Sequence, residues 1–468
     1  MGGEARNQTA RFALSTVACY PAVDGSHRKE FHMSIRLFAW VAVLVLASPA
    51  LAQDYAEQEW YRLAVEQGDA DAQFSLGRRY YAGEGVPQDY AEAAKWVRLA
   101  AEQGSAVAQS VLGLMYSNGE GVPQDDAESV RWYQMAADQN HSAARSILGL
   151  MYYGDGEKVP QDHAEEARWY RLAAEKGQAA AQHHLGAMHG NGDGVQQSFA
   201  EARRWFRLAA EQGLASAQYN LGILHSTGGG GRQSNRKAAR WVRLAAEQGL
   251  AAAQYELGLM HGAGRGVRQN HAEEVRWIRL AAEQGYPAAQ ASLGYMYGSG
   301  EGVPQDYAEE LRWLRLAAAQ NYANAQYNLG VMYDQSQGVP EDDVEAVRWF
   351  RLAAEQNHAY AQHSLGTMYR NGEGVPQDHA EAALWYRLAA KQGNAFAQYN
   401  LGTMYRNGHG VPQNDREAAI WFALALANGY DRDMATSALQ RASASMSYAE
   451  RDAVRQEAAR RMELMHSP

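Results

Sequence analysis

Apolar and polar residues alternate along most of the chain with the period of a helix. In the first complete unit, Ala72, Leu76 and Tyr80 are spaced four apart and therefore lie along one side of a helix. A second apolar stripe follows over residues 93–100. Residues 83–87, Gly-Glu-Gly-Val-Pro, separate the stripes and are typical of a loop that ends a helix. Each unit is therefore predicted to be a helix, a glycine loop, a second helix and a tight turn.

The whole unit then repeats every 36 or 37 residues, a period typical of stacked repeat architectures. A Leu-Gly pair marks the first helix of each unit, with its glycine at Gly77, Gly113, Gly149, Gly186, Gly222, Gly258, Gly294, Gly330, Gly366 and Gly402. A glycine inside a helix costs about 1 kcal/mol relative to alanine. Its return in ten units predicts that a neighbouring helix approaches closely at this position.

Polar residues mark both ends of the second helix. Asp89 with Glu92 three positions later predicts a capping box, and similar pairs recur in the following units. At the other end, Gly104 suits a left-handed helix terminus. In four units we expect an asparagine to replace this glycine: Asn140, Asn321, Asn357 and Asn428. Two further helices, near 435–443 and 447–465, are expected to cap the C-terminal end.

The unit Ala-Gln-x-x-Leu-Gly-x-Met-Tyr, followed by Gly-x-Gly-Val-Pro-Gln-Asp and a Trp-containing helix, resembles the Sel1-like repeat family, relatives of tetratricopeptide repeats. The resemblance covers residues 53–429 and implies an all-α solenoid, a right-handed superhelix of about ten helix pairs. Residues 53–68 would form a half repeat before it, and residues 430–468 would form the capping helices. The family's usual role, as an adaptor for protein–protein contacts, implies a non-catalytic scaffold that binds a protein or peptide.

The N-terminal region has the pattern of an export signal. A short basic start at residues 33–36 precedes an apolar run over 37–47 and small residues before Ala52. We expect cleavage between Ala52 and Gln53, a periplasmic or secreted protein, and an upstream extension over 1–32. An uncleaved anchor is the alternative, although eleven apolar residues are too few to span a membrane.

The composition and net charge of the chain disfavour several classes of function. The net charge of -10 disfavours a general nucleic-acid coat. The single cysteine, Cys19, lies upstream of the repeats, so neither a disulfide framework nor a thiol metal site is expected. Histidine replaces the usual tyrosine at His189, His225 and His261, but equivalent positions in adjacent units are too far apart to share an ion. We interpret these histidines as packing substitutes, and we expect no metal, cofactor or catalytic residue.

One motif favours a rival function. Ser234 and Lys237 match Ser-x-x-Lys, the acylating motif of penicillin-recognising enzymes, although no Lys-Thr-Gly accompanies it. A serine at this position also fits a helix cap. Penicillin-binding or hydrolytic activity at the cell wall therefore remains an alternative, as does binding of peptidoglycan or another carbohydrate.

Two groups of residues are candidates for partner binding. Tetratricopeptide relatives line the concave face with their first helices, so aromatic and amide side chains of these helices would form a ladder there. The ladder comprises Phe74, His183, Tyr219, Asn220, Tyr255, Tyr327, Asn328, His363, Tyr399 and Asn400. Tyrosine offers rigid contact area, and asparagine can hold an extended peptide backbone. The alternative is that these side chains serve contacts between helices.

The second candidate is a basic patch in units four to six. The segment from Val195 to Ala282 contains 12 lysines and arginines but six acidic residues. Five of the basic residues lie at loops or helix starts: Arg232, Arg236, Lys237, Arg265 and Arg268. Such a patch can steer an acidic partner, and the alternative is an ordinary solvated face.

Overall fold

A computed structural model describes residues 64, 66–153 and 161–466. The expected upstream extension, the signal sequence and most of the half repeat lie outside the described residues. In the described ranges the chain forms 22 helices and no strand. The described residues divide into two compact units, the first up to residue 250 together with 265–267, and the second of residues 251–264 and from residue 268 onward.

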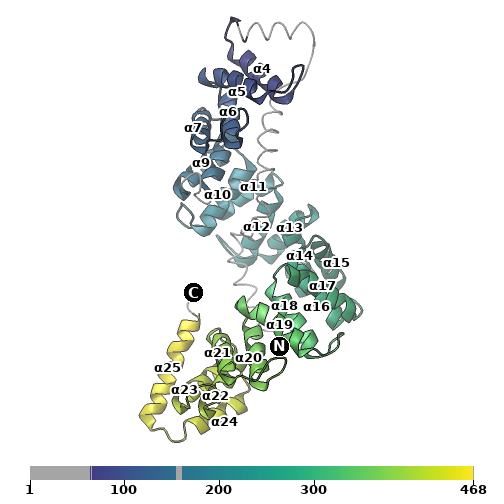
Figure 1. Cartoon of the computed structure of the whole chain (residues 1–468), viewed down its shortest axis with the longest axis vertical. Coiled ribbons are helices and arrows are strands. Elements are labelled where there is room, and N and C mark those ends of the chain that lie inside the picture. The colour runs from purple at the N-terminus through teal and green to yellow at the C-terminus, as the bar shows by residue number, and fades with distance from the viewer. Residues whose placement is uncertain (1–63, 65, 154–160, 467–468) are drawn as a thin grey trace. The chain divides into compact units, whose positions relative to one another are not determined.

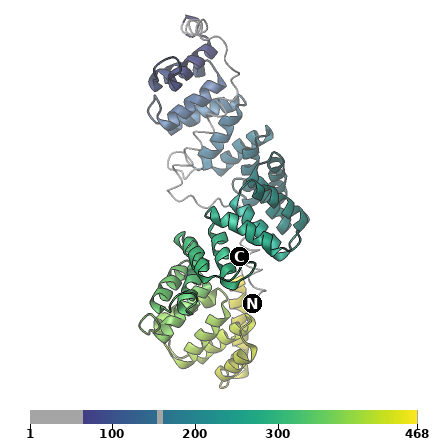
Figure 2. The ribbon, with the colours of Figure 1, turned by 90° about the vertical axis from the view of Figure 1, so that its right-hand side faces the viewer.

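The helices form consecutive pairs, each with a first helix (even label) and a second helix (odd label) (Figures 1 and 2). The first unit contains α4 (Ala70–Ala82), α5 (Tyr90–Glu102), α6 (Ala106–Asn118), α7 (Asp126–Asp138), α8 (Ser142–Tyr153), α9 (His163–Glu175), α10 (Ala179–Asn191), α11 (Phe199–Glu211), α12 (Ala215–Thr227) and α13 (Asn235–Glu247). The second unit contains α14 (Ala251–Ala263), α15 (His271–Glu283), α16 (Pro287–Ser299), α17 (Tyr307–Ala319), α18 (Ala323–Asp334), α19 (Asp343–Glu355), α20 (Ala359–Asn371), α21 (His379–Lys391), α22 (Ala395–Asn407), α23 (Asp415–Ala427), α24 (Arg432–Ala442) and α25 (Tyr448–His466). The chain is therefore an all-α solenoid, as its sequence predicts.

The glycine of the first helix lies where the second helix comes closest. A Cβ atom on Gly222 would lie 2.6 Å from Cγ2 of Val242 and 3.3 Å from the carbonyl oxygen of Ala238. The equivalent glycine Gly366 would meet the ring of Tyr386 at 2.8 Å. The predicted close approach is confirmed. The nearest atoms belong to a buried side chain of the second helix, with its backbone carbonyl just behind.

The predicted caps form, but the glutamate of the capping box has another role. The Asp89 carboxylate accepts hydrogen bonds from the backbone amides of Ala91 and Glu92, at 2.9 and 3.0 Å. The Asp89 amide itself donates to the carbonyl of Tyr80 at 2.9 Å, so Glu92 is not needed there. Glu92 instead pairs with a basic residue three positions on. A reciprocal box forms at α25, where the Ser447 amide donates to Glu450 at 2.7 Å.

Left-handed residues end the second helices, with one correction to the expected set. Asn140, Asn321 and Asn357 have φ of 66°, 61° and 66° and confirm the prediction. The prediction for Asn428 is wrong: its φ is -89°, and Gly429 takes the left-handed conformation with φ of 87°. Asn428 lies one position earlier in the repeat, where other units have glutamine.

That glutamine belongs to a buried polar network that is not among the features predicted from the sequence. Gln362 on α20 is 2% exposed. Its amide donates to the carbonyl of Ala354 at 3.1 Å, at the end of the preceding second helix. Its carbonyl oxygen accepts from Gln392 at 2.7 Å, at the end of the second helix in its own pair. Equivalent glutamine bonds recur on α6, α10 and α22, so each of these first helices binds the ends of two second helices.

Candidate functional site

The three histidines that replace tyrosine are core residues. His225 is 2% exposed, and His189 and His261 are also buried. A guanidinium nitrogen of Arg203 lies 2.5 Å from Nδ1 of His225. Because arginine can only donate, that ring nitrogen is an acceptor and the ring is neutral. Burial and the positive charge of Arg203 lower the pKa of His225 to about 4. These residues occupy the packing positions that the sequence predicts for them.

The Ser-x-x-Lys motif lies at the start of α13. Ser234 is its N-cap, and the Ser234 hydroxyl accepts a hydrogen bond from the backbone amide of Lys237 at 3.4 Å. The Lys237 side chain is exposed. The spacing of the two residues is thus explained by helix capping. In the described ranges, no group of three or more His, Cys, Asp or Glu side chains could hold a metal ion.

The predicted ladder residues mostly contact the next pair of helices. The side-chain amide of Asn400 donates to Nε2 of His363 at 3.1 Å, and Asn220 donates to His183 at 3.0 Å. The hydroxyl of Tyr255 lies 3.1 Å from a serine hydroxyl of the following first helix. His183 is buried, and the other ladder side chains are half-buried: Phe74, Tyr219, Asn220, Tyr255, Tyr327, Asn328, His363, Tyr399 and Asn400. The ladder side chains that form such a hydrogen bond therefore use their polar atoms in contacts between helices.

Three of the ladder residues belong to two groups of contacting rings in the second unit. We call the two groups together the aromatic row: the first contains Tyr327, His358 and Tyr360, and the second contains His363, Phe396, Tyr399 and Tyr430. The ring centroids of Tyr327 and His358 lie 4.9 Å apart, and those of Tyr399 and Tyr430 lie 4.3 Å apart at 12°. Phe396 connects the second group, with its ring centroid 6.0 Å from that of His363 and 5.5 Å from that of Tyr430.

Two members of the row project into solvent. Tyr360 is 44% exposed and Phe396 is 52% exposed. Each lies two residues before the buried glutamine of its first helix, where the other first helices of this unit carry alanine or asparagine. Neither residue belongs to the predicted ladder. The sequence feature that distinguishes them is an aromatic residue at a position where the other first helices of this unit carry a small residue.

The opposite ends of the same two helices are basic. Arg370 on α20 and Arg406 on α22 lie in the last helical turn and are half-buried. Within the described part of the chain neither pairs with a carboxylate, and Arg370 bonds to the amide oxygen of Asn371. Ten residues separate Tyr360 from Arg370, which is about 15 Å along a helix. The first-helix face of these pairs thus offers exposed rings at one end and positive charge at the other.

Comparisons with known proteins identify the repeat. The Sel1 repeat family matches the chain in eleven segments: 58–69, 70–105, 106–141, 142–178, 179–214, 215–250, 251–286, 287–322, 323–358, 359–394 and 395–430. The chain belongs to the Sel1 repeat family.

Two solved structures of Sel1 repeat proteins resemble it. A protective antigen of uropathogenic Escherichia coli, described as displaying an SLR fold, is 33% identical, with 87% of this chain and 94% of that chain covered and a TM-score of 0.56. A Sel1 repeat protein from Oxalobacter formigenes is 32% identical, covers 78% of this chain and 93% of its own, and has a TM-score of 0.47. A comparison with curated proteins gave no match.

Sel1 repeat proteins generally act as protein-interaction scaffolds, and their fold is typically non-catalytic. None of the helices in the described ranges of this Sel1 repeat protein is both long and apolar enough to cross a membrane.

The basic patch has a structural cause in the fifth Sel1 repeat. In other repeats a glutamate at the third position of the second helix pairs with an arginine three residues on. Lys237 replaces that glutamate in α13, so Arg240 has no carboxylate partner among the described residues. Arg232 and Arg236 are exposed beside it. Of the remaining predicted members, Arg265 is half-buried and has a polar partner, and Arg268 is exposed in the second unit.

Proposed function

We propose that this Sel1 repeat protein is a non-catalytic scaffold that binds a protein segment on the aromatic row. The observation that carries the proposal is the exposure of Tyr360 and Phe396 against Tyr327 and His363, half-buried rings that each contact a further ring of the core. Exposed aromatic residues on a rigid surface are typical of protein interfaces, because a large contact area forms at little cost in conformational entropy. Clustered apolar exposure of this kind marks interaction sites.

The chemistry of the face indicates what the segment carries. Its apolar part packs on Tyr360 and Phe396, and a carboxylate near its other end pairs with Arg370 or Arg406. An extended chain advances about 3.3 Å per residue, so the 15 Å between these ends corresponds to about five residues. A partner with an apolar side chain and an acidic residue about five positions apart matches this face. The acidic residue of such a partner is consistent with the basic patch, which also favours an acidic partner.

We propose that this binding takes place in the periplasm or outside the cell, because residues 33–52 have the pattern of an export signal. That part of the proposal rests on residues 33–52 of the sequence alone. Intact-mass measurement of the protein recovered from the periplasmic fraction tests it. A species that begins at Gln53 is expected, and recovery of the uncleaved chain from the cytoplasm would contradict it.

A site-specific photo-crosslinker tests the binding face. p-Benzoylphenylalanine replaces Tyr360 in one version of the protein and Tyr448, an 82% exposed tyrosine on α25, in the control version. We expect one protein to crosslink at position 360 in cells and not at position 448. Loss of that product in a Phe396→Ala background would show that the row contributes to binding. Equal crosslinking at both positions, or a product containing only cell-wall glycan, would refute the proposal.

A further inference from the structure

A recurring cluster covers the tryptophan of the second helices. In α17 a nitrogen of Arg312 lies 3.1 Å from a carboxylate oxygen of Glu309, and the guanidinium carbon lies 5.0 Å from the ring centroid of Trp313. The glutamate neutralises the arginine, and the arginine covers the indole by a cation–π contact. The same arrangement occurs at Arg131, Arg168, Arg204, Arg276 and Arg348.

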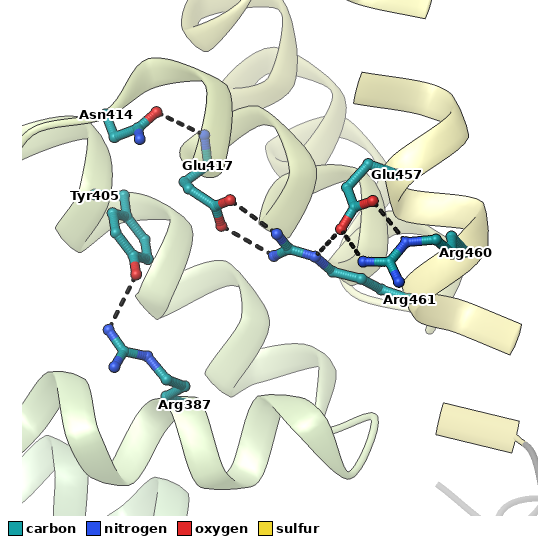
Figure 3. Close-up of polar contacts among 7 residues, drawn as sticks. All are labelled: Arg387, Tyr405, Asn414, Glu417, Glu457, Arg460 and Arg461. Atoms are coloured by element: carbon teal, nitrogen blue, oxygen red, sulfur yellow. Dashed lines mark hydrogen bonds and ion pairs between the residues drawn. The ribbon is translucent and has the colours of Figure 1, made fainter. Parts of the chain in front are cut away.

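In the last repeat the arginine comes from a different helix. Ile420 replaces it in α23, and Arg461 of α25 takes its place (Figure 3). The guanidinium of Arg461 makes two hydrogen bonds to the Glu417 carboxylate, at 2.8 and 2.9 Å, and lies 5.2 Å from the ring centroid of Trp421. The cluster is therefore complete, although Glu417 and Arg461 are 44 residues apart in sequence.

The rest of α25 covers the apolar face that Ile420 creates. Val454 and Ala458 are 3% and 8% exposed, and Met462 and Met465 continue their stripe at helical spacing. Beneath them Ile420 is 1% exposed. The α25 stripe thus defines the kind of helix that fits such a face: small and apolar residues spaced along one side, with an arginine beside them.

The preceding repeat has the same departure in sequence but no covering helix. Leu384 replaces the arginine in α21, in the series Glu381-x-x-Leu384-Trp385. Leu384 is 49% exposed, and Leu388 one turn later is 38% exposed. The Glu381 side chain is exposed and pairs with no cation in the described part of the chain. An apolar face with an uncompensated carboxylate beside a tryptophan is therefore open to solvent.

We infer that this face, the α21 site of Glu381, Leu384, Trp385 and Leu388, is a docking site for an amphipathic helix of a partner protein. The helix places an arginine between Glu381 and Trp385 and packs an apolar stripe on the two leucines, as α25 does on α23. The charge of Glu381 selects a basic residue, and the two leucines select an apolar stripe. The α21 site lies on a second helix and does not depend on the aromatic row.

The test uses a fluorescently labelled synthetic peptide of residues 448–466, the sequence of α25, and the full-length protein. Fluorescence anisotropy is expected to show saturable binding. A peptide with methionine at the position of Arg461 is expected to bind about tenfold more weakly, because a bidentate arginine–carboxylate pair is lost. Equal binding of the two peptides, or no binding at a peptide concentration of about 1 mM, overturns the inference.

Leu384→Arg supplies the matched control variant. It restores the Glu-x-x-Arg-Trp series of the neighbouring repeats, so the protein is expected to fold normally, with an unchanged thermal midpoint. Binding of the peptide is expected to fall at least about tenfold, since the new arginine occupies the place of the docked one. Unchanged binding to Leu384→Arg would show that the peptide binds elsewhere, for example by exchange with α25, and would overturn the inference.

Discussion

Replacing the buried glutamine of one repeat tests whether the polar network stabilises the stack. Gln362→Met keeps the volume of the side chain but removes its bonds to the carbonyl of Ala354, to Asn357 and to Gln392. A hydrogen bond contributes about 1 kcal/mol net. The Ala354 carbonyl keeps a hydrogen bond from the backbone amide of Asn357 at 3.0 Å, so it is not left without a donor. Because the side chains of Gln392 and Asn357 are exposed, water can replace their bonds to Gln362. We therefore expect a local loss of about 1–2 kcal/mol.

Hydrogen–deuterium exchange is the suitable assay, because a repeat array opens locally and a single unfolding free energy is not well defined for it. Amides of α20 and of the last turn of α19 are expected to exchange about 5 to 30 times faster in Gln362→Met. The control is Gln392→Ala, which removes the exposed partner and should change exchange by less than about threefold. Equal exchange in the wild type and Gln362→Met would refute the reasoning, since the network would then contribute nothing beyond packing.

Three other changes have defined outcomes. Gly222→Ala should cost about 1–3 kcal/mol of local stability, measured by hydrogen–deuterium exchange in α12 and α13, because its Cβ meets Val242 at 2.6 Å, and adding Val242→Ala should recover part of that loss. Burial raises the pKa of Glu310 from 4.5 to about 7, so its contribution to stability is present below pH 4.5 and is lost as pH rises through 7. Glu310→Gln should therefore be locally more stable than the wild type at pH 8, by up to about 3 kcal/mol, and no more stable at pH 4, measured by comparing hydrogen–deuterium exchange in α17 of the two proteins at each pH. Replacing all five basic-patch residues with glutamine should weaken capture of the crosslinked partner and reduce the salt dependence of its binding. Unchanged binding would contradict a role of the patch in attracting the partner. The residues are Arg232, Arg236, Lys237, Arg265 and Arg268.

Most of the fold could be predicted because it depends on local rules. Glycine in a helix, aspartate before a helix and asparagine after one each have a physical reason that a single unit reveals. Asn428 shows the limit of this approach. An asparagine near a helix end suggests a residue in the left-handed conformation. Only the alignment of Gly429 with the other left-handed glycines shows that Asn428 replaces a glutamine instead.

The candidate site was harder to predict because it depends on which surface each side chain faces. The ladder residues were chosen by their side-chain type, but His363 and Asn400 are 37 residues apart and bond to each other across the stack. The sequence pattern cannot distinguish that contact from one with a partner. Tyr360 and Phe396 were missed because aromatic residues are common in every unit, and only their exposure separates them from the core.

Tyr360 of the aromatic row and the α21 site lie on the two helices of the same pair, which predicts that ligands at the two places affect each other. Tyr360 lies on α20, and Leu384 lies on α21. A helix docked on α21 stabilises the closed pair and reduces the opening of α20, so a ligand on the row then loses less conformational entropy on binding. By linkage the effect is reciprocal. Saturation with the α25 peptide should therefore slow hydrogen–deuterium exchange in α20 as well as in α21. Slower exchange in α21 alone would show that the two faces act independently, and Leu384→Arg should show neither effect.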